Sequence, residues 1–225
     1  MTTITDSALE AVSGIQDGAT VLIGGFGKAG QPVELIAALL EHGATELTVV
    51  NNNAGNGDEG LAALIGARRV RRIICSFPRQ SDSHRFDEEY RAGRIELELV
   101  PQGNLAERIR AAGAGIGGFF TPTGYGTMLA VGKETRVLGG VGQVFELPIH
   151  GDAALIAAHT ADRQGNLVYR KTARNFGPIM ATAAAATIAQ VGSVVPTGEL
   201  DPENVVTPSI FVSTVVDLGA GKETL

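Results

Sequence analysis

A cluster of glycines near the N-terminus has the composition and spacing of an anion-binding turn. Four glycines between residues 24 and 30 follow the apolar, β-branched run of residues 20–23 and precede Pro32, a residue typical of a helix start. Glycine lets the backbone turn tightly and approach a ligand, and the N–H groups at a helix N-terminus attract anions. Residues 17–43 therefore predict a strand, a turn that can hold a phosphate, and a helix.

Part of this turn, from Gly25 to Gly30, fits the pattern G-x-G-x-x-G. Between a strand and a helix, this pattern commonly marks the pyrophosphate site of a dinucleotide. A dinucleotide site also needs an acidic residue about 20 residues further on, to hold the ribose hydroxyls. The next strand instead runs into Asn51, Asn52 and Asn53, which counts against NAD. The phosphate of another carrier and a purely structural turn both remain open.

Two side chains further along the chain could take part in acyl chemistry. Glu59 ends a glycine-rich loop before a helix, where a carboxylate could attack a thioester or simply favour the first turn of the helix. Gln102 follows a strand, between Pro101 and Gly103. Its amide could donate a hydrogen bond to a developing oxyanion, or it could be an ordinary turn residue. For both side chains a purely structural role is the more common one.

Other kinds of catalytic centre are not indicated. Cys75 is the single cysteine and follows two isoleucines, so we expect it in the core and expect no disulfide. Serine catalysis lacks its G-x-S-x-G turn. We expect no metal site, because metal-ligand spacing is absent among His42, His84, His150 and His159.

Alternating strands and helices must position these residues. Residues 20–23 and 47–50 suit buried strands, and residues 95–100 alternate apolar residues with Glu, which suits a strand with one exposed face; each is followed by a segment with helical spacing, with short connections. This alternation predicts a parallel sheet built of βα units. The expected fold class is α/β, with an open, mostly parallel sheet and flanking helices.

The second half of the chain is less regular. Six glycines crowd residues 113–126, where we expect an ordered functional loop or a mobile flap. We expect one domain over residues 1–225, with its core at about 5–216 and a frayed tail from Gly219. The remaining expected elements are strands at 144–147 and 155–158, a hairpin near 163–169, a buried helix at 178–186, and strands at 188–195 and 210–216.

Composition limits the broad class of the protein. The chain has 225 residues, 44% of them hydrophobic, which is enough for one large core. Its net charge of -6 argues against a nucleic-acid or membrane-surface role. The N-terminus lacks the pattern of a signal peptide, and no apolar run reaches the length of a membrane span. We therefore expect a cytoplasmic protein.

Several blocks of the sequence, taken together, resemble the family I CoA-transferases. The blocks are DGATVLIGGFGKAGQP, NNNAGNGDEGL, VPQGNLAERIRAAGAGIGGFFTPTGYGT and YRKTARNFGPIM, in that order. The resemblance covers roughly residues 5–215. Within the family it is to the A (alpha) subunits of two-subunit 3-oxoacid enzymes, and the segments CSFPRQSDS and IELELVPQGNLAERIRAAG are most similar to those acting on 3-oxoadipate.

The resemblance implies both a fold and a reaction. The fold would be the open α/β architecture that CoA-transferases share with ribose-5-phosphate isomerase. The chain would pair with a B (beta) subunit, as a heterodimer or as A2B2, and move CoA from succinyl-CoA to 3-oxoadipate in aromatic catabolism through the β-ketoadipate pathway. The CoA thioester would be a substrate, and no tightly bound cofactor is expected. Acetoacetate is the alternative acceptor.

The resemblance also implies roles for individual residues. The family's nucleophile is a glutamate in a Ser-Glu-Asn-Gly type motif of the B subunit; this chain lacks that motif, so we do not assign the nucleophile to Glu59. Gln102 matches a glutamine that stabilises the oxyanion, and Asn51 and Asn52 match asparagines at the mouth of the active site. The family's CoA-associated turn corresponds to Gly24, Gly25, Phe26, Gly27, Lys28, Ala29 and Gly30.

The second carboxylate of 3-oxoadipate should meet a cation. Arg79 and Arg174 are the candidates, because a guanidinium suits bidentate contact with a carboxylate. Two functions of other classes remain as alternatives to the transferase: an NAD-linked oxidoreductase, and a sensor domain that binds a phosphorylated metabolite without turnover.

Overall fold

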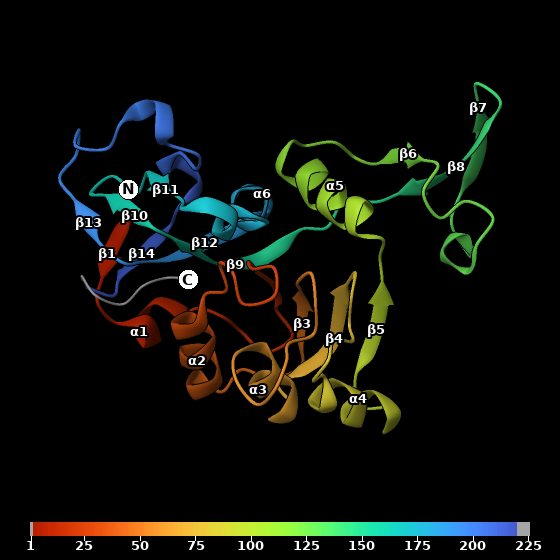
Figure 1. The fold of residues 1–225 in the computed structure, drawn as a ribbon, viewed down its shortest axis with the longest axis horizontal. Helices are drawn as coiled ribbons and strands as arrows, with labels where there is room; N and C mark the ends of the chain where they lie inside the picture. Colours follow the sequence, from red (N-terminus) through yellow and green to blue (C-terminus); the bar gives the residue numbers. More distant parts are fainter. Residues whose placement is uncertain (1, 220–225) are drawn as a thin grey trace.

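The computed structural model describes residues 2–219 and is built on an eight-stranded parallel sheet (Figure 1). The strand order is β1-β14-β12-β9-β2-β3-β4-β5. The expected α/β class is therefore confirmed. The strands are β1 (Thr3–Thr5), β2 (Thr20–Ile23), β3 (Leu47–Val50), β4 (Val70–Cys75), β5 (Glu96–Leu99), β9 (Gly151–Ala158), β12 (Ala184–Val191) and β14 (Thr214–Asp217).

Helices cover both faces of this sheet (Figure 1). One layer contains α1 (Ala8–Val12), α2 (Val33–His42), α3 (Leu61–Gly66) and α4 (His84–Arg91). The other contains α5 (Gln102–Gly113) and α6 (Gly177–Ala183), which pack against each other. Capping residues fix the ends of the helices in the first layer. The Ser7 side chain accepts the N–H of Glu10 at the start of α1, and Gly43 ends α2 in the left-handed conformation.

Two hydrophobic cores lie on the two faces of the sheet. Because successive side chains of a strand point to opposite faces, Val21 and Ile23 of β2 pack with α1 to α4, whereas Leu22 packs with α5 and α6. The same alternation separates Val49 from Val50 in β3. Strands buried on both faces need near-continuous apolar runs, which is why the sequence made β2 and β3 easy to predict.

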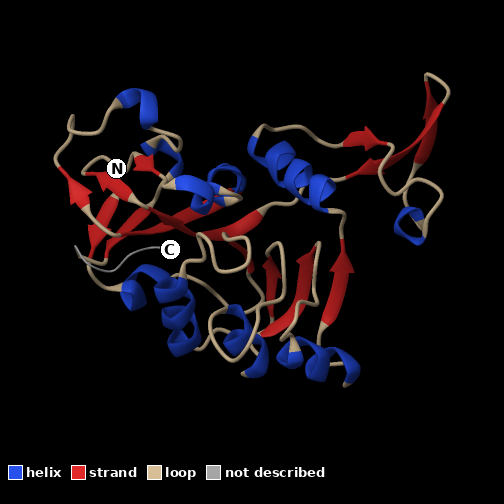
Figure 2. Cartoon of the chain, in the orientation of Figure 1, coloured by secondary structure: helices blue, strands red, loops and turns tan. Residues whose placement is uncertain are grey.

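The glycine-rich stretch of residues 113–126 is mostly loop and turn, as expected, but it contains the short strand β6 (Phe119–Thr121). It enters a three-stranded antiparallel sheet of order β6-β8-β7, which projects from the body and which we call the arm, residues 116–147 (Figures 1 and 2). The close packing of Gly118 explains part of the glycine content, since a Cβ there would lie 2.2 Å from the ring of Phe145. The arm contains β6 (Phe119–Thr121), η1 (Met128–Ala130), β7 (Thr135–Leu138) and β8 (Val141–Glu146).

Three further boundaries differ from expectation. Gln102 is the first residue of α5 rather than part of a turn. The alanine-rich segment leaves the helix at Ala183 and continues as β12, because pairing with β9 and β14 overrides helix propensity. The expected strand at 188–195 is divided between two sheets, since β13 (Val194–Val195) belongs to the small sheet β11-β10-β13.

The expected hairpin near residues 163–169 is confirmed by antiparallel β10 (Thr160–Asp162) and β11 (Leu167–Val168). The short 3-10 helices η2 (Lys171–Arg174), η3 (Pro202–Asn204) and η4 (Ser209–Phe211) complete the described elements. Most of the expected frayed tail lies outside residues 2–219. Within those residues, no helix has the length and apolar character required to cross a bilayer.

Candidate functional site

A cavity of about 530 Å³ lies beyond the carboxyl ends of β2, β3 and β4. In open α/β sheets, ligands bind at this edge. Each of the loops that follow these three strands contributes to the wall, which also receives Gln190 from β12. Side chains on the wall include Lys28, Gln31, Asn53, Glu59 and Gln80.

The glycine turn forms one side of the cavity but does not present an open helix end. The carbonyl oxygen of Gln31 accepts the N–H of Val33, and Gln190 Oε1 accepts the N–H groups of Glu34 and Leu35, each at 3.1 Å. The first donors of α2 are therefore already satisfied. The expectation that a phosphate would sit on this helix terminus is not supported by this arrangement.

A distant segment of the chain holds the glycine turn in place. Asn175 Oδ1 accepts the N–H of Gly25 at 3.1 Å, and Asn175 Nδ2 donates to the carbonyl oxygen of Ala29 at 2.9 Å. Gly30 has a φ of 69°, and a Cβ on it would lie 2.2 Å from the carbonyl oxygen of Ala173. The turn and residues 169–180, two of the sequence blocks described above, thus form one structural unit.

The side chains of Asn51 and Asn52 are buried and connect neighbouring strand ends by hydrogen bonds, and neither residue lines the cavity. Asn51 Nδ2 donates to the carbonyl oxygen of Ile23 at 2.7 Å, which ties β3 to β2. Asn52 Oδ1 accepts the hydroxyl of Ser76 at 2.7 Å, which ties the end of β3 to that of β4. Both amides therefore support the cavity indirectly, because they hold together the strand ends from which its loops leave.

Asn53 is the asparagine that reaches the cavity wall, and residue-by-residue reasoning missed it. Its Oδ1 accepts the N–H of Gly55 at 2.8 Å, whereas its Nδ2 is buried with no acceptor in the described chain. An unmet buried donor costs about 1–3 kcal/mol, and native proteins rarely keep one without a purpose. The only signal in the sequence was the run of three asparagines itself, which cannot say which amide stays unpaired.

The two candidates for acyl chemistry lie at the same edge of the sheet. Glu59 is exposed on the cavity wall, just before α3. Gln102 is exposed after β5, two strands from β3, and its side chain has no partner in the described chain. It does not line the cavity.

Cys75 is buried, as expected, and burial raises the pKa of its thiol to about 12, which rules it out as a nucleophile at neutral pH.

Arg79 and Arg174 are placed differently from each other. Arg79 Nε contacts Asp87 at 2.5 Å, and its guanidinium lies over the rings of Phe86 and Tyr90, at 5.6 and 5.5 Å. These contacts hold Arg79 against α4, and it does not line the cavity. Arg174 lies in η2, beside the glycine turn.

A histidine and two aspartates join the loops on the rim of the cavity. His84 Nδ1 lies 2.9 Å from Asp82 and its Nε2 lies 3.2 Å from Asp58. These hydrogen bonds, first that to Asp82 and then that to Asp58, raise the pKa of His84. The hydrogen bonds from Arg85 and His84 lower the pKa of Asp58. The loops after β3 and β4 are thereby held together by charge.

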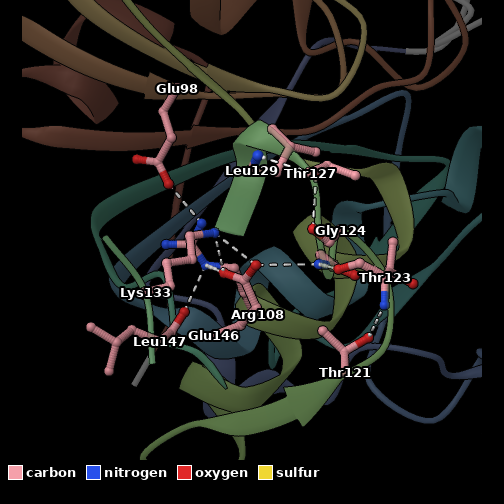
Figure 3. Close-up of polar contacts among 11 residues, drawn as sticks. Glu98, Arg108, Thr121, Thr123, Gly124, Thr127, Leu129, Lys133, Glu146 and Leu147 are labelled. Atoms are coloured by element: carbon pink, nitrogen blue, oxygen red, sulfur yellow. Dashed lines mark hydrogen bonds and ion pairs between the residues drawn. The ribbon is translucent and has the colours of Figure 1, made fainter. Parts of the chain in front are cut away.

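A partly buried ion-pair network joins α5, whose first residue is Gln102, to the arm (Figure 3). Arg108 donates to Glu98 at 2.7 Å and lies 3.7 Å from Glu146, and Lys133 of the arm donates to Glu146 at 2.7 Å. Burial raises the pKa of Glu98, but the hydrogen bond and charge of Arg108, with the charge of Arg72, lower it overall. The network fixes the orientation of α5 against the arm.

Sequence comparisons match the chain to proteins of known activity. The family model for coenzyme A transferase matches residues 5–218. The A subunit of the 3-oxoadipate CoA-transferase of Pseudomonas putida is 65% identical over 211 residues, which cover 94% of this chain and 91% of that protein. The A subunit of the probable succinyl-CoA:3-ketoacid coenzyme A transferase of Bacillus subtilis is 47% identical over 220 residues, which cover 98% and 91%.

A solved structure confirms the architecture. The apoenzyme of an acyl-CoA transferase from Escherichia coli O157:H7 superposes with a TM-score of 0.87 at 22% identity. The superposition covers 100% of this chain and 48% of that one. At this identity the similarity establishes the fold, and the chain spans about half the length of the E. coli protein.

Proposed function

The chain belongs to the coenzyme A transferase family, and from this premise we propose that it is the A subunit of a 3-oxoadipate CoA-transferase. The observation that carries the proposal is the 65% identity to the P. putida protein over nearly its whole length, against 47% to the B. subtilis 3-ketoacid enzyme. The reaction would convert succinyl-CoA and 3-oxoadipate to succinate and 3-oxoadipyl-CoA.

The proposed chemistry runs through a glutamate of the B subunit. Its carboxylate attacks the thioester carbonyl of succinyl-CoA, the C–S bond breaks, and a mixed anhydride forms with release of the CoA thiolate. The thiolate then attacks the glutamyl carbonyl, which releases succinate and leaves a glutamyl-CoA thioester. The carboxylate of 3-oxoadipate repeats these steps in reverse and restores the free glutamate.

The A subunit would supply hydrogen-bond donors to this sequence. Each attack places negative charge on a carbonyl oxygen, and one well-placed donor typically lowers such a barrier by a few kcal/mol. We assign this role to Gln102, which is exposed at the carboxyl end of β5 with its amide unpartnered in the described chain. Asn53 Nδ2 is a second donor, which we assign to a carbonyl or carboxylate oxygen of the acid bound in the cavity.

The second carboxylate of 3-oxoadipate needs a cation within reach of the cavity. The sequence pointed to Arg79, but that role requires its ion pair with Asp87 to open on binding. Lys28 already lines the cavity and has no acidic partner in the described chain. If Arg79→Ser leaves the preference for 3-oxoadipate over acetoacetate unchanged while Lys28→Met removes it, the lysine carries the specificity.

A thioester assay tests the proposed function. Succinyl-CoA and 3-oxoadipate are supplied to this chain alone, and then to the chain co-expressed with a B subunit. Turnover that requires both proteins supports the proposal. Turnover by this chain alone would assign the nucleophile to one of its own carboxylates, with Glu59 on the cavity wall tested first by Glu59→Gln. A parallel assay with acetoacetate separates the two acceptor acids.

A further inference from the structure

The lysine and arginine side chains of this acidic protein differ in whether they contact a hydrogen-bond acceptor. Most lysine and arginine side chains within residues 2–219 have a carboxylate or carbonyl acceptor, including the arginines between residues 68 and 72. Four have none in that part of the chain: Lys28, Arg163, Lys171 and Arg174. Three of these four, all except Arg163, gather at the glycine turn.

The turn separates two concave surfaces. Gly27 and Lys28 face the cavity described above, whereas Phe26 and Ala29 line a second hollow of about 650 Å³ on the other side. The rest of the hollow, which we call the outer hollow, is lined by Lys171, Thr172, Arg174 and Asn175. No carboxylate is among its lining residues, and Phe26, which is one of them, is 48% exposed.

The outer hollow is built by interactions across the sequence rather than by a mobile surface. The hydrogen bonds of Asn175 to Gly25 and Ala29 and the close approach of Gly30 to Ala173 lock η2 against the turn. Lys171 has a φ of 51°, a left-handed conformation that is uncommon for a residue with a side chain. Strain of this kind clusters at ligand sites, where surrounding contacts maintain it.

We infer that the outer hollow binds the 3′-phosphorylated adenosine diphosphate end of the CoA thioester. Lys171 and Arg174 pair with its phosphates, the Thr172 hydroxyl can donate a further hydrogen bond, and the exposed Phe26 ring stacks on the adenine. The thioester end then crosses the turn toward the cavity that contains Asn53. The inference rests on the proposed function for the identity of the ligand, and it extends the CoA site from the glycines to η2.

The test compares variants of the assembled complex of A and B subunits. Arg174→Gln and Lys171→Gln remove cations of the outer hollow, and Arg163→Gln removes the matched cation that lies elsewhere. All three side chains are exposed, so the fold should be retained. We expect the Kd of CoA, measured by calorimetry, and the KM of succinyl-CoA to rise about tenfold or more in the first two variants. The kcat and the KM of the acceptor acid should not change, and Arg163→Gln should match the native complex.

A truncated substrate sharpens the test. Succinyl-pantetheine carries the thioester but no nucleotide, so its kcat/KM should be the same for the native complex and for the outer-hollow variants. Phe26→Leu should raise the Kd of CoA while leaving succinyl-pantetheine turnover unaffected. A variant that slows both substrates equally would contradict a nucleotide site.

The outcomes separate this inference from the proposed function. An unchanged Kd of CoA in Arg174→Gln and Lys171→Gln overturns the inference, and so does dissociation of the complex in sedimentation, because the cations would then contact the partner. Calorimetry requires no turnover. A complex that binds CoA through these residues but transfers it to no 3-oxoadipate would overturn the proposed function alone. Absence of CoA binding to the native complex would overturn both.

Discussion

At the scale of the residue, hydrogen-bond partners distinguish asparagines that look alike in the sequence. Three buried polar side-chain atoms lack a partner in the described chain, and of these only Asn53 Nδ2 belongs to a residue of the cavity wall. The amides of Asn51 and Asn52 bind neighbouring strand ends. A change at Asn53 should therefore affect activity, whereas a change at Asn51 should affect stability.

The first prediction follows from that difference. Asn53→Asp retains the acceptor for the N–H of Gly55 but replaces the free donor, so kcat of the complex should fall about 100-fold. Asn51→Ala should instead lower the free energy of unfolding by about 1–3 kcal/mol, because it leaves the carbonyl of Ile23 unsatisfied. Steady-state kinetics and urea denaturation measure the two effects. Native-like kcat in Asn53→Asp would remove Asn53 from the site.

The second prediction concerns Gln102. Since its amide has no partner in the described chain, Gln102→Ala should lower kcat by about 100-fold to 1000-fold and leave Tm unchanged. Glu107→Gln, on the exposed face of the same helix, is the control and should retain activity. A loss of Tm that parallels the loss of kcat would mean that Gln102 stabilises α5 rather than the transition state.

At the scale of the element, charged contacts hold the functional loops and the arm in place. Glu146 of the arm is 2% exposed and lies between Arg108 of α5 and Lys133 of the arm, so it ties the arm to the helix that precedes it (Figure 3). A buried charge that loses its partner is costly because little water reaches it. The orientation of α5, and with it the position of Gln102, should therefore depend on Glu146.

The third prediction tests this network. Glu146→Ala should lower the free energy of unfolding by about 1–3 kcal/mol, because Lys133 and Asn104 lose their acceptor while Arg108 keeps its ion pair with Glu98. Amide hydrogen exchange should also quicken across the arm. Glu134→Gln breaks only an exposed pair with Arg136 and should change neither quantity measurably. Slow exchange in the arm of Glu146→Ala would show that its strands hold it without the network.

The fourth prediction uses the raised pKa of His84. A raised folded pKa means that the contribution of His84 to stability is full below its ordinary pKa of about 6.5 and is lost as the pH rises through the folded value. The difference in Tm between the native chain and His84→Gln should therefore be larger at about pH 5.5 than at about pH 8.5. A difference that stays constant over that range would refute a charged contact with Asp58 and Asp82.

At the scale of the whole molecule, the parallel sheet both carries the two cores and collects the functional loops at one edge. Strand β2 is central in this respect, since its residues enter both cores and its carboxyl end leads into the glycine turn. Stability and function are thus linked through the same strand. A substitution in β2 at a residue that lines neither concave surface should change the stability without changing kcat.

The fifth prediction makes that separation. Leu22→Ala removes a fully buried side chain and should lower the free energy of unfolding by about 2–5 kcal/mol. The kcat per folded complex should remain native, because Leu22 lines neither the cavity nor the outer hollow. Val33→Ala, at a position 49% exposed, should cost far less. If kcat of Leu22→Ala falls strongly under conditions where all of the protein is folded, the loss of core packing must also distort the glycine turn.

The sequence by itself determined the α/β class, the strand, turn and helix around residues 20–42, and the family resemblance. Buried strands and helix ends depend on local composition and periodicity, and motifs in order along the chain require no knowledge of contacts. Of the arm, only the end of β8 was expected from the sequence; β6 and β7 escaped prediction because they are short strands that form by pairing with β8. Likewise, β12 is a strand because β9 and β14 flank it, despite its alanines.

Tertiary structure alone decided which polar groups are free to act. The satisfied start of α2 depends on Gln190, and the place of the glycine turn depends on Asn175, both about 150 residues away along the chain. The free amide of Asn53 and the unpaired cations of the outer hollow are likewise what remains after distant partners have been matched. A hydrogen bond or ion pair between such distant residues forms only when the fold brings them together, and no local pattern records it.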